Sequence, residues 1–231
     1  MKHKKKKLII YGDSSYAEMI AHYFQTDSEY QVVAYCADKA YRTREEIDGL
    51  PVVDLENIED NFSPKNHTIF AAIGYKSVRM HKVLFEKIAQ LPFPVASYIS
   101  SQAIVDTSSE IGVNCLILPG CILEPDTIIE ENCFINSAAI VCHHTRIKAH
   151  SILAAGSVIG GHTTIGESSL IGFNATVAEL LQVGSETLLG AGSLLLQNTE
   201  DHTMYVGTPA KAIRKHIDTG IVLSSNNLNK G

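Results

Sequence analysis

Two adjacent histidines, His143 and His144, are the residues of this chain with the clearest capacity for chemistry. A neutral imidazole accepts a proton near pH 7, so it suits general-base catalysis toward an incoming amine or hydroxyl. Asp126 and His162 lie at equal separations before and after His144. Whether these separations bring the side chains together depends on the elements that position them.

Those elements are indicated by a strict repeat of six. Every sixth residue from Ile99 to Leu195 is Ile, Leu or Val, and the residue two places before each is small except at Leu181. Helices and paired strands have other periods, so the repeat predicts a solenoid in which each hexad supplies a short strand and a turn. Three hexads close one triangular coil. Successive coils then stack as parallel strands about 4.8 Å apart.

The repeat also assigns roles to glycines and cysteines. Six glycines directly follow aliphatic positions, where we expect corners that need a permissive backbone: Gly112, Gly160, Gly166, Gly172, Gly184 and Gly190. Cys115, Cys121 and Cys133 occupy the small inward register and are interpreted as core residues. The five cysteines show no CxxC or other metal-ligand spacing, so we expect neither disulfides nor a metal site.

A coil of three hexads stacks Asp126 under His144 and Glu124 under Cys142. Either carboxylate is placed to hold an imidazole in a useful tautomer. We favour an Asp126–His144 pair beside His143 as the hypothesis, and Glu124 remains the alternative.

The N-terminal third alternates strand and helix patterns and predicts a small parallel sheet covered by helices, an α/β Rossmann-like domain. Expected strands are 7–11, 31–37, 52–53 and 67–73, with helices near 16–24, 55–61 and 77–91. Ligands of such sheets lie at the carboxyl ends of the strands. The candidate contacts for a phosphorylated acceptor are therefore Gly12, Ser14, Ser15, Asp38, Lys39, Gly74 and Arg79. The G-x-G-x-x-G fingerprint is not met, which argues against a redox dinucleotide; a docking cap without a ligand is the alternative.

Composition narrows the class of partner. The net charge is −6 and the pI about 5.9, which argues against nucleic acid. No segment approaches the roughly 20 apolar residues of a membrane span, and no signal peptide is recognisable. We therefore expect a cytoplasmic protein.

Three motifs carry a resemblance to a known family. They are Phe134-Ile135-Asn136-Ser137 followed by Val141-Cys142-His143-His144, then Gly160-Gly161 leading to Leu170–Thr176, and finally Gly190-Ala191-Gly192 with the ending Val206-Gly207-Thr208-Pro209-Ala210-Lys211. With the N-terminal domain, they resemble the sialic acid O-acetyltransferase and bacillosamine N-acetyltransferase-like family of sugar acyltransferases. Two departures stand out. The first loop reads Gly12–Ala17 as GDSSYA where the family has G-A-S-G-H-G/A, and His144 follows His143 where the family commonly has Asp or Glu.

The resemblance implies a left-handed parallel β-helix, a homotrimer, acetyl-CoA as co-substrate, and a sugar acceptor in nucleotide-linked form, in bacterial surface-glycan synthesis. We expect domains at 1–95 and 96–214 and a C-terminal tail at 215–231, whose polar end we expect to be frayed. By the same resemblance His143 is the general base, Asn136 faces the acceptor, and the CoA contacts are Gly161, Gly190, Ala191, Lys211 and Arg214. Gly161 is also an oxyanion candidate through its backbone amide.

Several alternatives stay open at this point. The motifs do not decide between acetylation of an amino group and the O-acetylation of a sialic-acid-type enzyme. The γ-class carbonic anhydrases share hexapeptide coils, but they pair two histidines five residues apart with a third about two coils earlier, and no histidine lies between His81 and His143. A non-catalytic trimeric scaffold is the third possibility.

Overall fold

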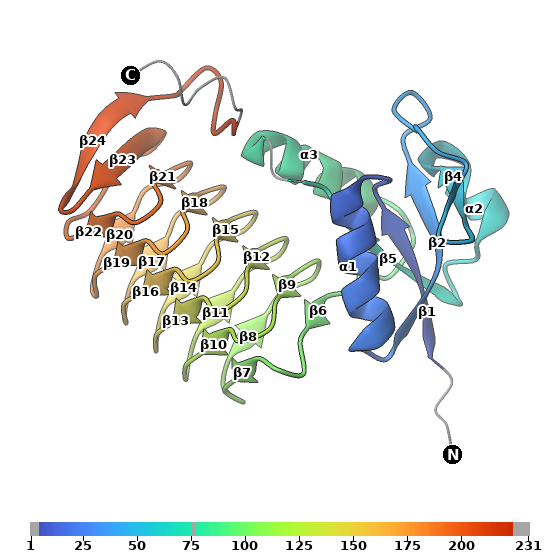
Figure 1. Ribbon diagram of the computed structural model, residues 1–231, viewed down its shortest axis with the longest axis horizontal. Helices are drawn as coiled ribbons and strands as arrows, with labels where there is room; N and C mark the ends of the chain where they lie inside the picture. The colour runs from blue at the N-terminus through green and yellow to red at the C-terminus, as the bar shows by residue number, and fades with distance from the viewer. Residues whose placement is uncertain (1–4, 75–76, 224–231) are drawn as a thin grey trace. The chain divides into compact units, whose positions relative to one another are not determined.

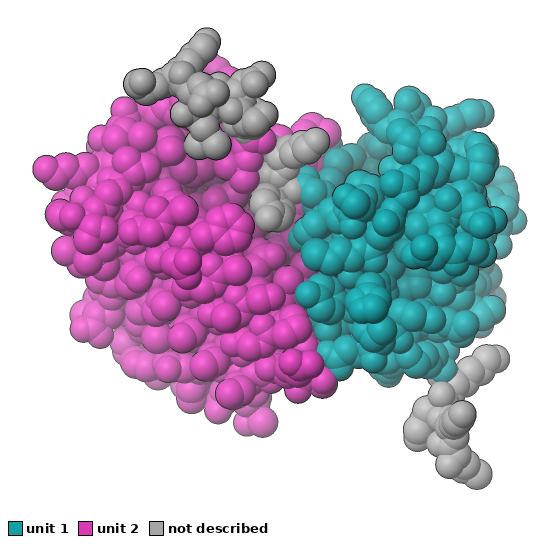
Figure 2. Space-filling model, in the orientation of Figure 1, with its two compact units in different colours: residues 1–74, 83–98 teal, residues 75–82, 99–231 magenta. Residues whose placement is uncertain are grey.

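A computed structural model of the 231-residue chain describes residues 5–74 and 77–223. These residues form two compact units, shown in different colours in Figure 2. The first comprises residues 1–74 and 83–98, and the second comprises residues 75–82 and 99–231. The boundary lies close to the one expected at 95/96, except that residues 75–82 group with the repeats.

The first unit contains a sheet of order β3-β4-β2-β1-β5. Its strands are β1 (Lys6–Tyr11), β2 (Tyr30–Ala37), β3 (Glu46–Ile47), β4 (Leu50–Asp54) and β5 (His67–Ala71). All neighbours are parallel except β3 and β4, which form an antiparallel pair. The sheet confirms the predicted Rossmann-like class, and β3 is a strand that the sequence pattern did not indicate.

Helices cover both faces of this sheet. Helix α1 (Ser15–Thr26) begins at Ser14, whose hydroxyl accepts from the Ala17 amide, and its Phe24 packs edge-on against Phe70 of β5. The other face carries η1 (Leu55–Asn57), α2 (Ile58–Asn61) and the 83–89 segment of α3 (Val78–Ala89). Among the described residues, none of the helices has the length and apolar character to cross a bilayer.

The second unit is a prism of stacked coils, seen from the side in Figure 1. The β12 sheet contains β6 (Tyr98–Ile99), β9 (Leu116–Ile117), β12 (Phe134–Ile135), β15 (Ile152–Leu153), β18 (Leu170–Ile171) and β21 (Leu188–Leu189), extended by β23 (Thr203–Gly207) and β24 (Ala210–Lys215). The β13 sheet contains β7 (Ile104–Val105), β10 (Ile122–Leu123), β13 (Ile140–Val141), β16 (Val158–Ile159), β19 (Thr176–Val177) and β22 (Leu194–Leu195). The β14 sheet contains β8 (Glu110–Ile111), β11 (Ile128–Ile129), β14 (Arg146–Ile147), β17 (Thr164–Ile165) and β20 (Gln182–Val183).

The predicted register is confirmed throughout these sheets. Strands one coil apart pair in parallel, for example Ile135 with Leu153 and Val141 with Ile159. From β9 to β22 the second residue of each strand points inward, and these residues, Ile117 to Leu195, are at most 4% exposed, whereas Ile99 at the start of the repeats is 45% exposed. Cys115, Cys121 and Cys133 are fully buried among them, as expected. The fold is therefore the left-handed parallel β-helix that the resemblance implied.

The corners differ from the sequence expectation. A left-handed backbone recurs every six residues from Asn114 to Gly192, three residues after each aliphatic position, and only Gly120, Gly156 and Gly192 in that series are glycine. The glycines that directly follow aliphatic positions have no such conformation. They are needed for space instead: a Cβ on Gly166 would lie 2.4 Å from the backbone of Gly184 in the next coil.

The outward face of the β12 sheet is covered within the second unit. His81 of α3 is 1% exposed, stacks edge-on on Phe134 at 4.5 Å between ring centroids, and its Nε2 lies 3.0 Å from the Asn132 carbonyl. The chain after β24 also packs here, because the Val78 amide donates to the Ile221 carbonyl and Ile221 is 2% exposed. Residues 216–223 thus belong to the second unit, and the polar end of the chain that the sequence predicted to be frayed lies outside the described residues.

Candidate active site

The histidine pair lies at a corner between β13 and β14. Val141 ends β13 with its side chain in the core, Arg146 begins β14, and His144 adopts the left-handed conformation that turns the chain between them. The His144 amide donates to the Pro125 carbonyl of the coil before, and the His162 amide donates to the His143 carbonyl. Ladder hydrogen bonds therefore fix the corner, and both imidazoles are exposed on it.

Three neighbours position the His143 ring. The Glu124 carboxylate accepts from the His143 backbone amide at 2.8 Å. The Nδ1 atoms of His143 and His144 lie 3.2 Å apart. Gly161 supplies the space above, because a Cβ at that position would be 2.8 Å from Cε1 and 3.0 Å from Nε2 of His143. The ring therefore lies directly over the bare backbone of Gly161.

The two carboxylates left open by the sequence have different functions. Asp126 Oδ2 is 3.5 Å from His144 Nε2, in line with the favoured pairing, while Glu124 binds backbone and not an imidazole. Asp126 and His144 are both about half exposed, so the pair orients the ring at little desolvation cost. The arrangement runs from Asp126 through His144 to His143.

Cys142, next to His143, does not have the character of a nucleophile. Partial burial and the Glu124 carboxylate raise the pKa of its thiol, so it remains protonated at neutral pH. Burial likewise raises the pKa of Cys121 to about 11 and that of Cys115 to about 12. The histidines are therefore the reactive groups of this corner.

His162 is a member of the site that sequence reasoning did not assign. Its ring stacks on His144 at 4.7 Å and lies 5.1 Å from His143, edge to face. The only sequence signal was its spacing of three hexads from His144, which indicated the same column but no role.

The candidate CoA contacts lie elsewhere in the second unit. Gly190 is closely packed, since a Cβ there would be 2.7 Å from Val206, while Ala191 is exposed at the following corner. Lys211 and Arg214 are exposed on β24. Arg214 also lines a cavity of about 420 Å³ formed with residues 215–222.

Asn136, the candidate contact to the acceptor, is half buried, and its side-chain amide nitrogen donates to the Leu153 carbonyl at 2.9 Å.

The acceptor candidates gather at the carboxyl edge of the sheet in the first unit. Gly12 follows β1 with a φ of 133°, and a Cβ there would lie 2.8 Å from the Ala72 carbonyl oxygen, so the turn requires glycine. Ser14 and Ser15 are exposed at the start of α1, and Lys39 is exposed after β2. Gly74, the last residue described before the gap, has open space around its Cα.

Two acceptor assignments are corrected by their contacts. Asp38 is 8% exposed and both its oxygens are engaged, one by the Tyr11 hydroxyl at 2.9 Å and one by Lys87 at 2.6 Å. Burial and this hydrogen bond raise the pKa of Tyr11, which stays a donor. Arg79 lies in the second unit, where its guanidinium binds Glu186 and the carbonyls of Ile217 and Asp218. Both side chains therefore have partners within the protein that help to hold the fold together.

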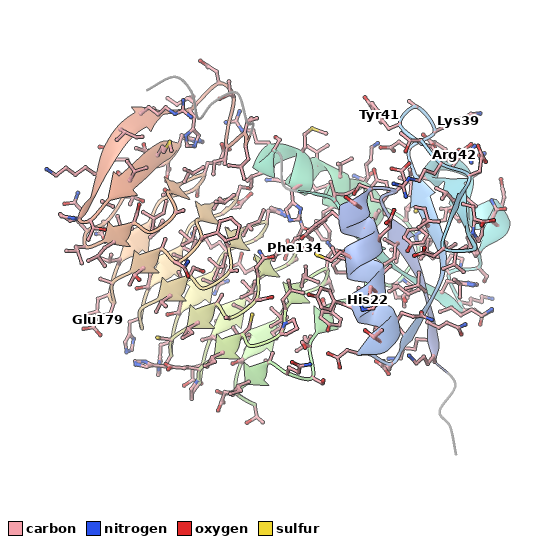
Figure 3. All side chains as sticks on the ribbon, in the orientation of Figure 1. His22, Lys39, Tyr41, Arg42, Phe134 and Glu179 are labelled. Atoms are coloured by element: carbon pink, nitrogen blue, oxygen red, sulfur yellow. The ribbon has the colours of Figure 1, made fainter. Side chains whose placement is uncertain are left out.

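The connection between β2 and β3 is hydrogen-bonded to the turn that follows Gly12, a contact that the sequence did not predict. Asp13 accepts from the Thr43 amide at 2.7 Å and from its hydroxyl at 2.8 Å, and Arg42 pairs with Asp54 at 2.9 Å. These contacts hold the connection between β2 and β3, where Lys39, Tyr41 and Arg42 are labelled in Figure 3. Tyr41 is 76% exposed on it.

Comparisons with known proteins bear on both units. Residues 99–219 match the family model described as the GMPPB C-terminal domain, and residues 7–87 match the PglD N-terminal domain. No curated protein matches the chain.

Solved structures resemble the chain over most of its length. The acetyltransferase domain of PglB from Neisseria gonorrhoeae, also solved with acetyl coenzyme A, is 25% identical with a TM-score of 0.80, over 90% of this chain and 100% of that one. PerB from Caulobacter crescentus, solved with CoA and GDP-perosamine, is 23% identical with a TM-score of 0.80, over 90% of this chain and 97% of that one. WeeI from Acinetobacter baumannii is 16% identical with a TM-score of 0.60, over 90% and 100%.

Proposed function

Because the chain belongs to the GMPPB C-terminal domain family and is a sugar acyltransferase of the hexapeptide-repeat fold, we propose that it acetylates an amino group of a nucleotide-linked sugar from acetyl-CoA. The observation that carries this proposal is the His143 ring, held between His144 and the bare backbone of Gly161. The bound CoA and GDP-perosamine of a similar fold support the choice of co-substrate and acceptor class.

The proposal places a proton on each ring from the proximity of Asp126 to His144 Nε2, 3.5 Å, and from the contact between the two Nδ1 atoms. When Asp126 accepts from Nε2–H of His144, the lone pair of that neutral imidazole is on Nδ1. His144 Nδ1 then accepts from Nδ1–H of His143, 3.2 Å away. The lone pair of His143 is thereby left on Nε2, the atom that lies over Gly161. His143 Nε2 is the general base.

The reaction is a direct transfer. The acceptor nitrogen attacks the thioester carbonyl, the N–C bond forms, and His143 Nε2 takes the proton that the nitrogen loses. Collapse of the tetrahedral intermediate breaks the C–S bond, and the imidazolium returns the proton to the CoA thiolate. The backbone amide of Gly161 is our candidate donor to the oxyanion. No acyl-enzyme is required, in keeping with the protonated Cys142.

The residues that we propose to bind the nucleotide phosphates and those that we propose to bind CoA belong to different units. The turn at Gly12, with Ser14, Ser15, Lys39 and Gly74, is our proposed site for the nucleotide phosphates, since amides at the start of α1 and a lysine suit an anion. The proposed CoA contacts remain Gly161, Gly190, Ala191, Lys211 and Arg214, and Asn136 the proposed contact to the sugar. We place the reaction in the cytoplasm, as a step of surface-glycan synthesis.

A homotrimer is the proposed assembly. The outward residues of the β13 sheet are only partly buried and are apolar except for Thr176; the apolar ones are Ile104, Ile122, Ile140, Val158 and Leu194. The β14 sheet is more polar and presents Glu110, Arg146, Thr164 and Gln182 beside one aliphatic residue, Ile128. The His143 corner borders the apolar sheet, so a second copy packed there would form one wall of the CoA groove.

The test measures thiol release from acetyl-CoA with a panel of UDP-, dTDP-, GDP- and CMP-linked amino and hydroxy sugars. We expect turnover with one amino sugar, and a loss of about 10²- to 10⁴-fold in kcat for His143→Ala. His22→Ala, which removes an exposed histidine on α1, serves as the matched control and should keep full activity. Turnover restricted to hydroxy sugars would identify an O-acetyltransferase. If no sugar of the panel gives thiol release and the protein does not bind acetyl-CoA, the result would favour a non-catalytic scaffold.

A further inference from the structure

Three imidazoles from two consecutive coils meet at the active-site corner. The ligating nitrogens of His143, His144 and His162 all lie within 4.8 Å of one another, and all three side chains are exposed. One base requires one ring and one orienting partner, so the proposed acetyl transfer leaves the third ring unexplained. We propose that these three histidines form a binding site for Zn²⁺ or a similar imidazole-preferring transition metal, and that metal and acetyl transfer exclude each other.

The geometry is close to that of a three-histidine site. Zn²⁺ binds imidazole nitrogens at about 2.0–2.1 Å in tetrahedral geometry, which separates two ligand nitrogens by about 3.4 Å. The Nδ1 atoms of His143 and His144 are already 3.2 Å apart. His162 stacks on His144 with an angle of 22° between the rings, and the proposed site requires a rotation of its exposed side chain toward the other two rings. The fourth position is open to water.

The charges around the rings also favour a dication. Asp126 Oδ2 lies 3.5 Å from Nε2 of His144, the side of the ring away from Nδ1, which is where carboxylates orient metal-bound histidines. The Glu124 carboxylate binds the His143 amide and adds a second negative charge at the corner. Nitrogen donors select Zn²⁺, Cu²⁺ or Ni²⁺ over Mg²⁺, which prefers oxygen.

Exclusion follows from the chemistry of one ring. A neutral imidazole has a single lone pair, so a His143 that donates it to a metal has no basic nitrogen left. This consequence rests on the proposed function, whereas metal binding itself does not. The same corner would therefore be active when metal-free and inhibited when metal is bound.

The test titrates Zn²⁺, and in parallel Mg²⁺, into chelator-treated full-length protein without a histidine tag, with no acetyl-CoA or acceptor present. Calorimetry should show one Zn²⁺ per chain and no Mg²⁺ binding. His162→Ala should weaken Zn²⁺ binding by at least about tenfold, and Asp126→Asn by about tenfold or more, because even outer partners of metal sites carry such effects. His22→Ala is the matched control and should leave the affinity unchanged.

A spectroscopic readout separates this site from the neighbouring thiol. Co²⁺ bound by nitrogen ligands should give visible bands without a thiolate charge-transfer band, and Cys142→Ser should bind as the wild type does. The proposal is overturned by absent or non-stoichiometric Zn²⁺ binding, by an affinity that His162→Ala leaves intact, or by a Cys142-dependent site. For protein that is active without metal, it is also overturned if saturating Zn²⁺ leaves thiol release unchanged. Inactive protein that still binds one Zn²⁺ would contradict the proposed function alone.

Discussion

At the scale of single residues, His143 depends on neighbours of three different kinds. Glu124 fixes its backbone, His144 fixes its ring nitrogen, and Gly161 contributes only empty space. Removing the empty space is the most selective perturbation, because it changes neither charge nor hydrogen bonding. The left-handed conformation is absent at Gly161, so alanine is compatible with the backbone there.

Gly161→Ala should therefore reduce activity by displacing the imidazole. The new Cβ would lie 2.8–3.2 Å from three ring atoms of His143, and the exposed ring can only move away. We expect kcat to fall by about 10²-fold, since a misplacement of about 1 Å has effects of that order. Steady-state thiol release measures it, with the thermal unfolding midpoint as a check that the coil is intact.

A double-mutant cycle decides whether the effect passes through His143. In a His143→Ala background the added methyl has no ring to displace, so Gly161→Ala should cause no further loss. If the two effects multiply instead, Gly161 acts independently, for example through its amide at the oxyanion.

Asp126→Asn should have a much smaller effect than His143→Ala. The Asp126–His144 pair spans 3.5 Å and both side chains are about half exposed, so it contributes at most about 1 kcal/mol. That corresponds to a loss of about two- to fivefold in kcat, accompanied by a changed pH profile of kcat/KM. An unchanged rate together with an unchanged profile would remove Asp126 from the mechanism.

At the scale of elements, the stacked strands concentrate stability on the inward aliphatic residues. Leu153 is 0% exposed between Ile135 and Ile171 of the neighbouring coils. Leu153→Ala should lower the free energy of unfolding by about 2–5 kcal/mol through the cavity it creates. Urea denaturation at one fixed protein concentration measures this loss. Leu196→Ala, at a 55% exposed position, should change it by less than about 0.5 kcal/mol; similar losses at both sites would contradict this account of the core.

The coils were predictable from sequence because one interior constraint recurs at every hexad. The corners were not, because the left-handed position accepts many residue types, including Asn114, His144, Leu180 and Glu186. The glycines expected to make the turns instead relieve close contacts with the next coil, and a glycine after an aliphatic position does not by itself distinguish these two roles.

The candidate site was predictable to the same degree. A spacing of three hexads placed Asp126 beside His144, because the ladder preserves that spacing. Arg79 and Asp38 were assigned to a ligand because the pattern showed their place at strand ends but not their partners. Glu186 lies 107 residues from Arg79, and Lys87 lies 49 from Asp38. Such pairings arise from tertiary packing, which periodicity does not encode.

At the scale of the whole molecule, the three sheets of the prism differ in what they present outward. The β12 sheet is covered, with Leu116, Phe134 and Ile152 at most 1% exposed. The β14 sheet is polar at Glu110 and Arg146. The β13 sheet is apolar except at Thr176 and is partly exposed, which is the character of a surface that another copy covers.

Ile122 and Ile128 offer a matched test of that assembly, because they are the same residue, half buried, outward-facing and one hexad apart in one coil. Ile122→Glu puts a carboxylate on the apolar β13 sheet, where burial between copies costs several kcal/mol, about 3 or more per ion. Ile128→Glu puts the same charge on the polar β14 sheet, where water still solvates it. Sedimentation velocity should show monomers for Ile122→Glu and trimers for Ile128→Glu and wild type.

Because the CoA groove is proposed to have a wall from a second copy, thiol release should be lower in the monomeric Ile122→Glu variant. A stable trimer of Ile122→Glu would place the contact on another surface, and an active monomer would show that one chain completes the groove alone.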